Sequence, residues 1–92
     1  MKTEDHRKVL EMDMTQLYAL RARNHVQLFS ARADVTQWAH SVAGTADAMF
    51  GLFTDRVHKL REAVVRLEVL SNDQLIVNTQ LTRLRVIAEQ VA

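Results

Sequence analysis

The chain has 92 residues, of which 48% are hydrophobic and 25% charged, and its formal net charge is +1. This length allows at most one domain, and the hydrophobic content excludes an intrinsically disordered chain. The absence of cysteine excludes disulfides, Cys-ligated zinc and thiol catalysis, while the near-neutral charge indicates no particular partner. We therefore expect a single domain over residues 1–92.

The composition predicts an all-α protein. Proline is absent and the only glycines are Gly44 and Gly51, so few residues interrupt helices. Leu, Ala, Arg, Gln and Glu, which favour helices, are frequent. The chain contains no run of 18 apolar residues and starts with a charged segment, so we expect neither a transmembrane helix nor a signal peptide.

The first predicted helix covers about residues 4–31. Thr3 can cap it, and Glu4 and Asp5 then lie in the first turn, where acidic groups interact favourably with the helix dipole. Its apolar residues follow the alternating four- and three-residue spacing of a packed helix seam. They are Leu10, Met14, Leu17, Leu28 and Ala31.

The second predicted helix covers about residues 35–70. Asp34 with Gln37 three residues later has the pattern of a capping box. Gly44-Thr45 predicts a kink or a break, which would raise the number of helices from three to four. The clearest apolar stripe of the chain follows, and we expect it to form the core and the interface: Phe50, Phe53, Val57, Leu60, Val64 and Leu67.

The third predicted helix covers about residues 72–91. Ser71 and Gln74 have the spacing of another capping box, and Leu81, Leu84 and Val91 continue an apolar stripe that should complete the core. On one continuous helix this stripe would be rotated by roughly 100° from the preceding one. A turn at residues 71–73 removes this offset. The alternative is one very long helix with local overwinding.

These elements predict a bundle or hairpin with a long central helix. Without a kink the central helix would measure ~54 Å and the first ~42 Å, so part of the central helix would stay uncovered in a monomer. A second copy would cover it, which favours a coiled-coil-like homodimer. A kink at Gly44 would instead permit a compact monomeric bundle.

The sequence shows no catalytic or metal-binding constellation. None of the four histidines stands three or four residues from another, and no nucleophile elbow or phosphate-binding glycine loop occurs. Asp55 and His58 are one turn apart, a spacing that allows them to pair or to bind a metal weakly. We expect no enzymatic activity, no catalytic or metal-ligating residues and no cofactor.

A basic row on the first predicted helix is the feature that suggests a charged partner. No acidic residue occurs between Asp13 and Asp34. Arg21 and Asn24 interrupt the apolar seam there, and a charge sealed in a core is unfavourable unless paired, so we expect an edge position or control of helix register. The basic residues that could contact nucleic acid or an acidic partner are Arg7, Arg21, Arg23, His25 and Arg32.

The leading hypothesis is a non-enzymatic helical protein–protein interaction module that self-associates through its apolar seam. Small helical proteins with such roles include assembly factors, chaperones, adaptors and inhibitors, which is a fold-level analogy. The alternative is a helical nucleic-acid binder, with double-stranded RNA as one candidate, that uses the basic row. We expect a homodimer, a further protein partner, no membrane contact and a cytoplasmic location.

Overall fold

The computed structural model describes residues 3–45 and 50–91, with Thr3, Glu4 and Phe50 described by their backbone alone. Three helices cover almost all of these residues: α1 (Thr3–Glu11), α2 (Met14–Thr45) and α3 (Phe50–Val91). The described part of the chain contains no strand. The predicted all-α class is confirmed.

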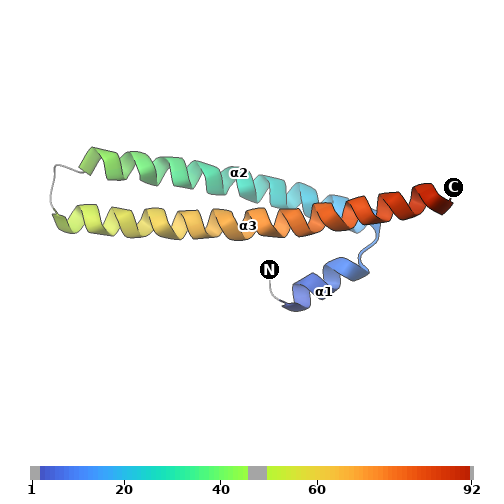
Figure 1. Cartoon of the computed structure of the whole chain (residues 1–92). Coiled ribbons are helices and arrows are strands. Elements are labelled where there is room, and N and C mark those ends of the chain that lie inside the picture. The colour runs from blue at the N-terminus through green and yellow to red at the C-terminus, as the bar shows by residue number, and fades with distance from the viewer. Residues whose placement is uncertain (1–2, 46–49, 92) are drawn as a thin grey trace.

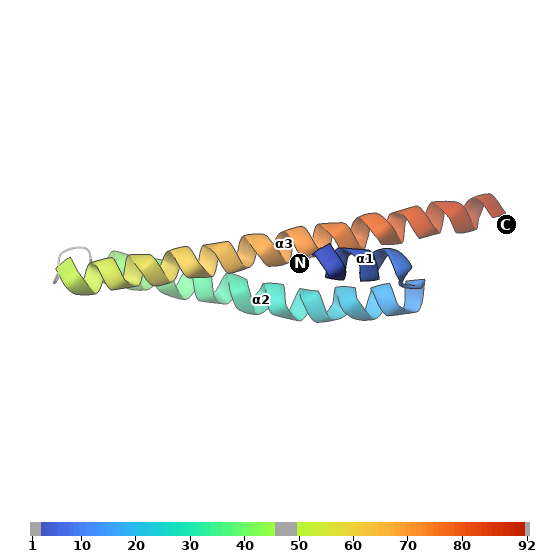
Figure 2. The ribbon, with the colours of Figure 1, turned by 90° about the horizontal axis from the view of Figure 1, so that it is seen from below.

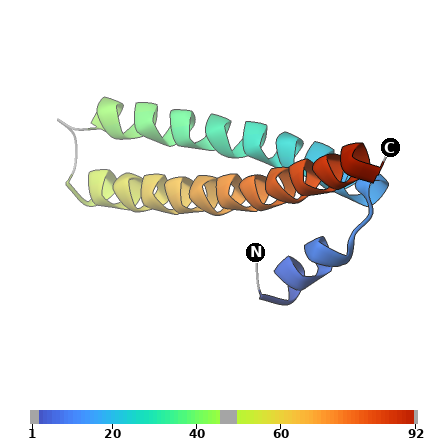
Figure 3. The ribbon, with the colours of Figure 1, turned by 45° about the vertical axis from the view of Figure 1, so that its right-hand side comes forward.

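Helices α2 and α3 run antiparallel and form a long hairpin, which Figure 1 shows from the side. Helix α1 folds back and packs against α3 at the end of the hairpin where α2 begins (Figures 2 and 3). The molecule is a rod with extents of 64 × 22 × 16 Å. The rod therefore has two helices in cross-section along most of its length and three where α1 packs near the start of α2, and beyond that point the C-terminal turns of α3 project alone (Figures 1 and 2).

The first helix ends much earlier than the predicted 4–31 range, at Glu11. Asp13 forms a reciprocal capping box with Gln16: the backbone N–H of Gln16 donates to Asp13 Oδ1 over 2.8 Å, and the N–H of Asp13 donates to Gln16 Oε1 over 3.0 Å. These bonds satisfy two of the free N–H groups at the start of α2. The prediction of one helix over 4–31 is wrong because this cap starts a new helix.

Helix α2 runs without interruption through residues 31–35, where the sequence predicted a boundary. Asp34 is not a cap but forms an ion pair with Arg66 of α3. The residues that face α3 keep the four–three spacing over the whole helix, so no break is needed to bury them. They are Leu17, Arg21, Asn24, Leu28, Ala31, Val35, Trp38, Val42 and Thr45.

Helix α3 also runs without interruption through residues 71–73, and the predicted turn is absent. The offset between the two predicted stripes came from assigning Val57 and Val64 to the seam. In the structure Ala63 is buried while Val64 is 37% exposed. With Ala63 and Leu70 in the seam, the spacing continues to Leu84 on a single face, and one straight helix satisfies it.

The C-terminal helix, rather than the central one, is the longest element. Helix α3 has 42 residues and α2 has 32, which correspond to ~63 Å and ~48 Å. Gly44 lies in the last turn of α2, and the helix ends at Thr45, whose hydroxyl donates to the carbonyl of Ser41 over 2.9 Å. The link to α3 falls in residues 46–49, outside the described residues.

Candidate interaction surface

The best-packed part of the molecule is the three-helix end. Val9 of α1, Leu17 of α2, and Val77 and Leu81 of α3 form a cluster in which no side chain is more than 2% exposed. Leu84 packs against this cluster and is partly buried. Two of the residues expected to complete the core, Leu81 and Leu84, thus lie in it, whereas the third, Val91, is 83% exposed.

The predicted α3 stripe lies at the two-helix end and is less well covered. The side chain of Phe50 falls outside the described residues. Four members of the stripe are half-buried: Phe53, Val57, Leu60 and Leu67. Opposite them, Val35, Trp38 and Val42 of α2 are half-buried as well. Two helices leave a seam open along both of its edges, and a third helix is required to close one of them.

The two edges of this seam differ in chemistry. On one edge Arg66 Nη1 lies 2.9 Å from Asp34 Oδ2 and bridges the two helices. Val57 and Val64, which directly follow the seam residues Arg56 and Ala63, lie on the opposite edge of α3. One edge is therefore closed by a polar bridge, and the other presents apolar side chains. We call Val57 and Val64, with the seam side chains Phe53 and Leu60, the open edge.

A polar layer separates the open seam from the closed core. Asn24 is 6% exposed, and its Nδ2 has no hydrogen-bond partner among the described residues. Gln74 Nε2 donates to the carbonyl of Arg21 over 3.1 Å, while its Oε1 is buried without a partner in the described part of the chain, as is that of Gln80 further along α3. A buried amide restricts how two helices can be aligned, because a shift of one helix along the other would place the amide among apolar groups. The expected register role of Asn24 agrees with this position.

Arg21 lies at the edge of the seam, which is one of the two alternatives that the sequence predicted for it. The side chain is half-buried, and its guanidinium carbon lies 4.8 Å from the centroid of the Tyr18 ring. A cation at this distance from an aromatic face is attracted by the ring quadrupole. The charge is therefore kept at the edge and stacked, and it does not enter the core.

The structure divides the predicted basic row between two helices. Arg7 lies on α1, which folds back, whereas Arg21, His25 and Arg32 lie on one side of α2, and Arg23 lies on its opposite flank. Arg7, Arg23, His25 and Arg32 are exposed. The prediction of a single row that includes Arg7 is wrong, because the chain reverses at Met12 and Asp13.

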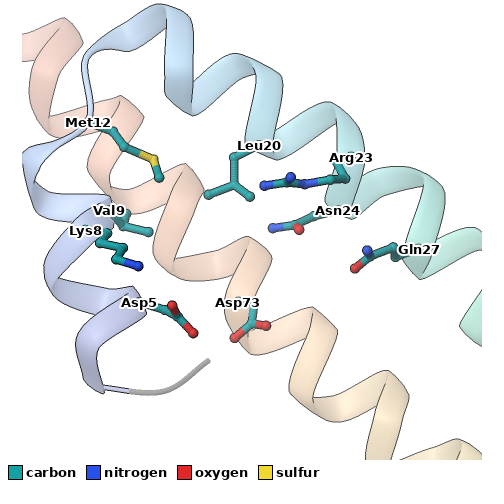
Figure 4. Close-up of a pocket in the computed structure, with 9 residues that line it drawn as sticks. All are labelled: Asp5, Lys8, Val9, Met12, Leu20, Arg23, Asn24, Gln27 and Asp73. Carbon is teal, nitrogen blue, oxygen red and sulfur yellow. The ribbon is translucent and has the colours of Figure 1, made fainter.

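A hollow of about 450 Å³ lies where the three helices meet (Figure 4). Its lining combines apolar side chains with the buried amide of Asn24 and with both acidic and basic side chains. The lining residues are Asp5, Lys8, Val9, Met12, Leu20, Arg23, Asn24, Gln27 and Asp73. Mixed charges around a wide opening do not select one ligand chemistry.

The remaining titratable side chains do not converge on a centre. The described ranges contain no group of three or more His, Cys, Asp or Glu side chains that could hold a metal ion. His58 Nε2 lies 3.0 Å from Glu62 Oε1 on the exposed side of α3. The carboxylate next to His58 is therefore that of Glu62, one turn towards the C-terminus, and not that of Asp55. Among the described helices, none has the length and apolar character needed to cross a bilayer.

Comparison of the chain with protein-family models, curated proteins and solved structures yields no match.

The prediction from sequence missed a second apolar stripe on α2. Ala22, Val26, Phe29 and Ala33 repeat the four–three spacing on the face turned away from α3, and all four are exposed. The spacing was visible in the sequence. It was overlooked because the seam on the opposite face already explained the helix.

Proposed function

We propose that this chain is a non-enzymatic protein–protein interaction module that self-associates through the open edge. The observation that supports the proposal is the difference in burial between the two ends of the hairpin. Where α1 covers the hairpin, the core side chains are almost fully buried. Where none of the described helices covers it, Phe53, Val57 and Leu60 remain half-exposed.

The association that fits this surface is a pair of hairpins. When two copies pack their open edges together, each supplies to the other the cover that α1 supplies at the opposite end. The product is a four-helix arrangement over the two-helix part of the rod. Val57 and Val64 of one copy would pack near the same residues of the other, as the symmetric interface of a dimer requires.

Burial of apolar surface favours this association, by about 25 cal/mol for each Å² removed from water. Residues that are already half-buried lose little further side-chain freedom on association, so the entropic penalty is smaller than for a mobile surface. The four open-edge side chains carry no charge, and the association must leave Arg61 and His58, which line the same hollow as Phe53 and Val57, in contact with water. The same logic accommodates a heterologous helical partner, as in adaptors and assembly factors.

The test is the solution mass of the full chain by analytical ultracentrifugation. We expect wild type to sediment with about twice the chain mass of 10.5 kDa. Val64→Asp places a carboxylate in the centre of the interface and should yield a folded monomer. Val69→Asp is the matched control, because Val69 has similar exposure on the same helix but lies away from the open edge.

Circular dichroism shows whether each variant keeps its helices. A wild-type chain that stays monomeric at all concentrations contradicts the proposal. So does a Val64→Asp variant that remains dimeric, because the interface would then lie elsewhere.

A further inference from the structure

The outer face of α2 has the character of an interface, although no described residue of the chain outside α2 covers it. Val26 is 68% exposed and Phe29 is 73% exposed. At ~100° per residue, Val26 lies about 160° from the seam residues Asn24 and Leu28, and Phe29 lies about 140° from Asn24 and about 100° from Leu28. A helix that is apolar on two separate sides is usually buried on both. Helix α2 is covered on only one.

The stripe extends along most of α2 without a charged residue. At the four–three spacing it comprises Ala19, Ala22, Val26, Phe29, Ala33, Thr36, His40 and Ala43, all of which are exposed. We call these residues the outer stripe, and at ~1.5 Å per residue it is ~36 Å long. Its small side chains let another helix approach closely, while Phe29 supplies a large anchor that projects from the middle.

The flanks of the outer stripe carry one sign of charge. Arg23 lies on one flank, and His25 and Arg32 lie on the other; all three are exposed. The nearest acidic residue on α2, Asp34, is engaged by Arg66, and the sequence from residue 14 to residue 33 contains no Asp or Glu. A partner with acidic residues beside its own apolar seam is therefore complementary to this face.

The same charges disfavour a second copy as the occupant. If two outer stripes packed antiparallel around Phe29, the arginines of both copies would flank one interface with no acid from either to pair them. Like charges across an interface are destabilising. A lipid surface is disfavoured for a different reason: only Val26 and Phe29 of the outer stripe are large apolar residues, which gives little surface to insert.

We infer that the outer stripe of α2 binds an amphipathic helix of another protein, with acidic residues on both sides of the apolar seam of that helix. The Phe29 ring packs between small or branched side chains of the partner, and Arg23 and Arg32 pair with its carboxylates. The outer stripe shares no residue with the open edge, so the inference does not depend on self-association, although Arg32 lies on the side of α2 that borders the open edge.

A selection experiment tests the partner chemistry directly. The probe is a yeast-displayed library of helices about 24 residues long, which match the length of the outer stripe at ~1.5 Å per residue. The seam positions are fixed as Leu and Ala, and the flanking positions are free to be Glu, Gln or Lys. Selection uses the full wild-type chain after depletion on the Phe29→Asp variant. We expect Glu to predominate at the flanks of the selected helices.

The selected helices should bind Phe29→Asp at least tenfold more weakly than wild type, and their affinity for wild type should fall as salt is raised. Val69→Asp on α3 is the control and should bind like wild type. If selection is repeated on the double variant Arg23→Glu, Arg32→Glu, the preferred flanks should change from Glu to Lys. Circular dichroism verifies that each variant is folded, and Val26→Asp provides a second disruption of the outer stripe.

Four results would overturn the inference. The first is the absence of any selected binder, and the second is a set of binders with neutral or basic flanks. The third is co-sedimentation with phosphatidylcholine–phosphatidylserine vesicles that Phe29→Asp abolishes, which would assign the face to lipid. The fourth is a lower solution mass for Phe29→Asp than for wild type, which would assign it to a second copy. Loss of self-association in Val64→Asp has no bearing on any of these results.

Discussion

Val9 is the side chain that attaches α1 to the rest of the molecule. It is 1% exposed and belongs to the core cluster with Leu17, Val77 and Leu81, while the other described side chains of α1 are exposed. Burial of a valine contributes about 1.5–3 kcal/mol. Ordering the backbone costs about 1–2 kcal/mol per residue before helix hydrogen bonds offset it. Helix α1 therefore docks with a small net free energy.

Val9→Asp removes this contribution and adds the penalty of burying a carboxylate, which amounts to several kcal/mol. The sum exceeds what holds α1 in place, so we expect α1 to detach and unfold while the α2–α3 hairpin stays folded. In an amide hydrogen-exchange experiment, residues 3–11 should exchange like an unstructured peptide, and the amides of α2 and α3 should stay protected. The helical signal should decrease by that of the nine residues of α1.

Leu17→Ala is the comparison for this experiment. Leu17 is fully buried in the same cluster but belongs to the hairpin, so its truncation should lower the free energy of unfolding by about 2–5 kcal/mol and reduce protection in both long helices. The reasoning about α1 is refuted if Val9→Asp unfolds the hairpin together with α1, or if the amides of α1 remain protected in that variant.

Three further predictions concern single positions. Ser71→Pro should lower the free energy of unfolding by about 3 kcal/mol or more, because α3 is continuous there and proline removes a helix hydrogen bond; a loss under about 1 kcal/mol in urea denaturation would indicate a turn instead. Asp13→Ala removes the acceptor for the N–H of Gln16 and should lower the free energy of unfolding by about 0.5–2 kcal/mol. An unchanged thermal melting curve would show that the Asp13 cap does not stabilise the protein. Asn24→Leu should raise the free energy of unfolding by about 1–3 kcal/mol, since it removes a buried Nδ2 that has no hydrogen-bond partner among the described residues. If urea denaturation gives a lower free energy of unfolding for this variant than for wild type, the Asn24 amide makes a stabilising hydrogen bond.

The prediction of helix ends was weaker than the prediction of helix type. Asp13–Gln16, Asp34–Gln37 and Ser71–Gln74 share the spacing of a capping box, yet only Asp13 caps a helix. A capping residue stabilises a helix start by about 1 kcal/mol. Continuation of a long seam buries several side chains and outweighs this preference. Packing between α2 and α3 therefore determines which of these three similar capping patterns starts a helix.

The assignment of the α3 seam shows the same dependence on a partner helix. Val57 and Val64 are more apolar than Arg56 and Ala63, and hydrophobicity alone favoured them. In the hairpin the small Ala63 is buried because it faces α2, while Arg56 reaches out of the seam and donates to the carbonyl of Ser41 over 3.3 Å. Which residues of α3 are covered depends on how each one is placed relative to α2. The sequence of α3 by itself does not contain this information.

The sequence alone determined the all-α class, because backbone propensity and the four–three spacing of apolar residues are local properties. It also placed Leu81 and Leu84 in the core, but wrongly added the exposed Val91, and it gave an edge position for Arg21 as one of its alternatives. The tertiary structure decided where the chain reverses, that α1 closes one end of the hairpin, and that α2 is apolar on two sides but covered on one. These features depend on which helix faces which, and burial is a property of the whole packed molecule.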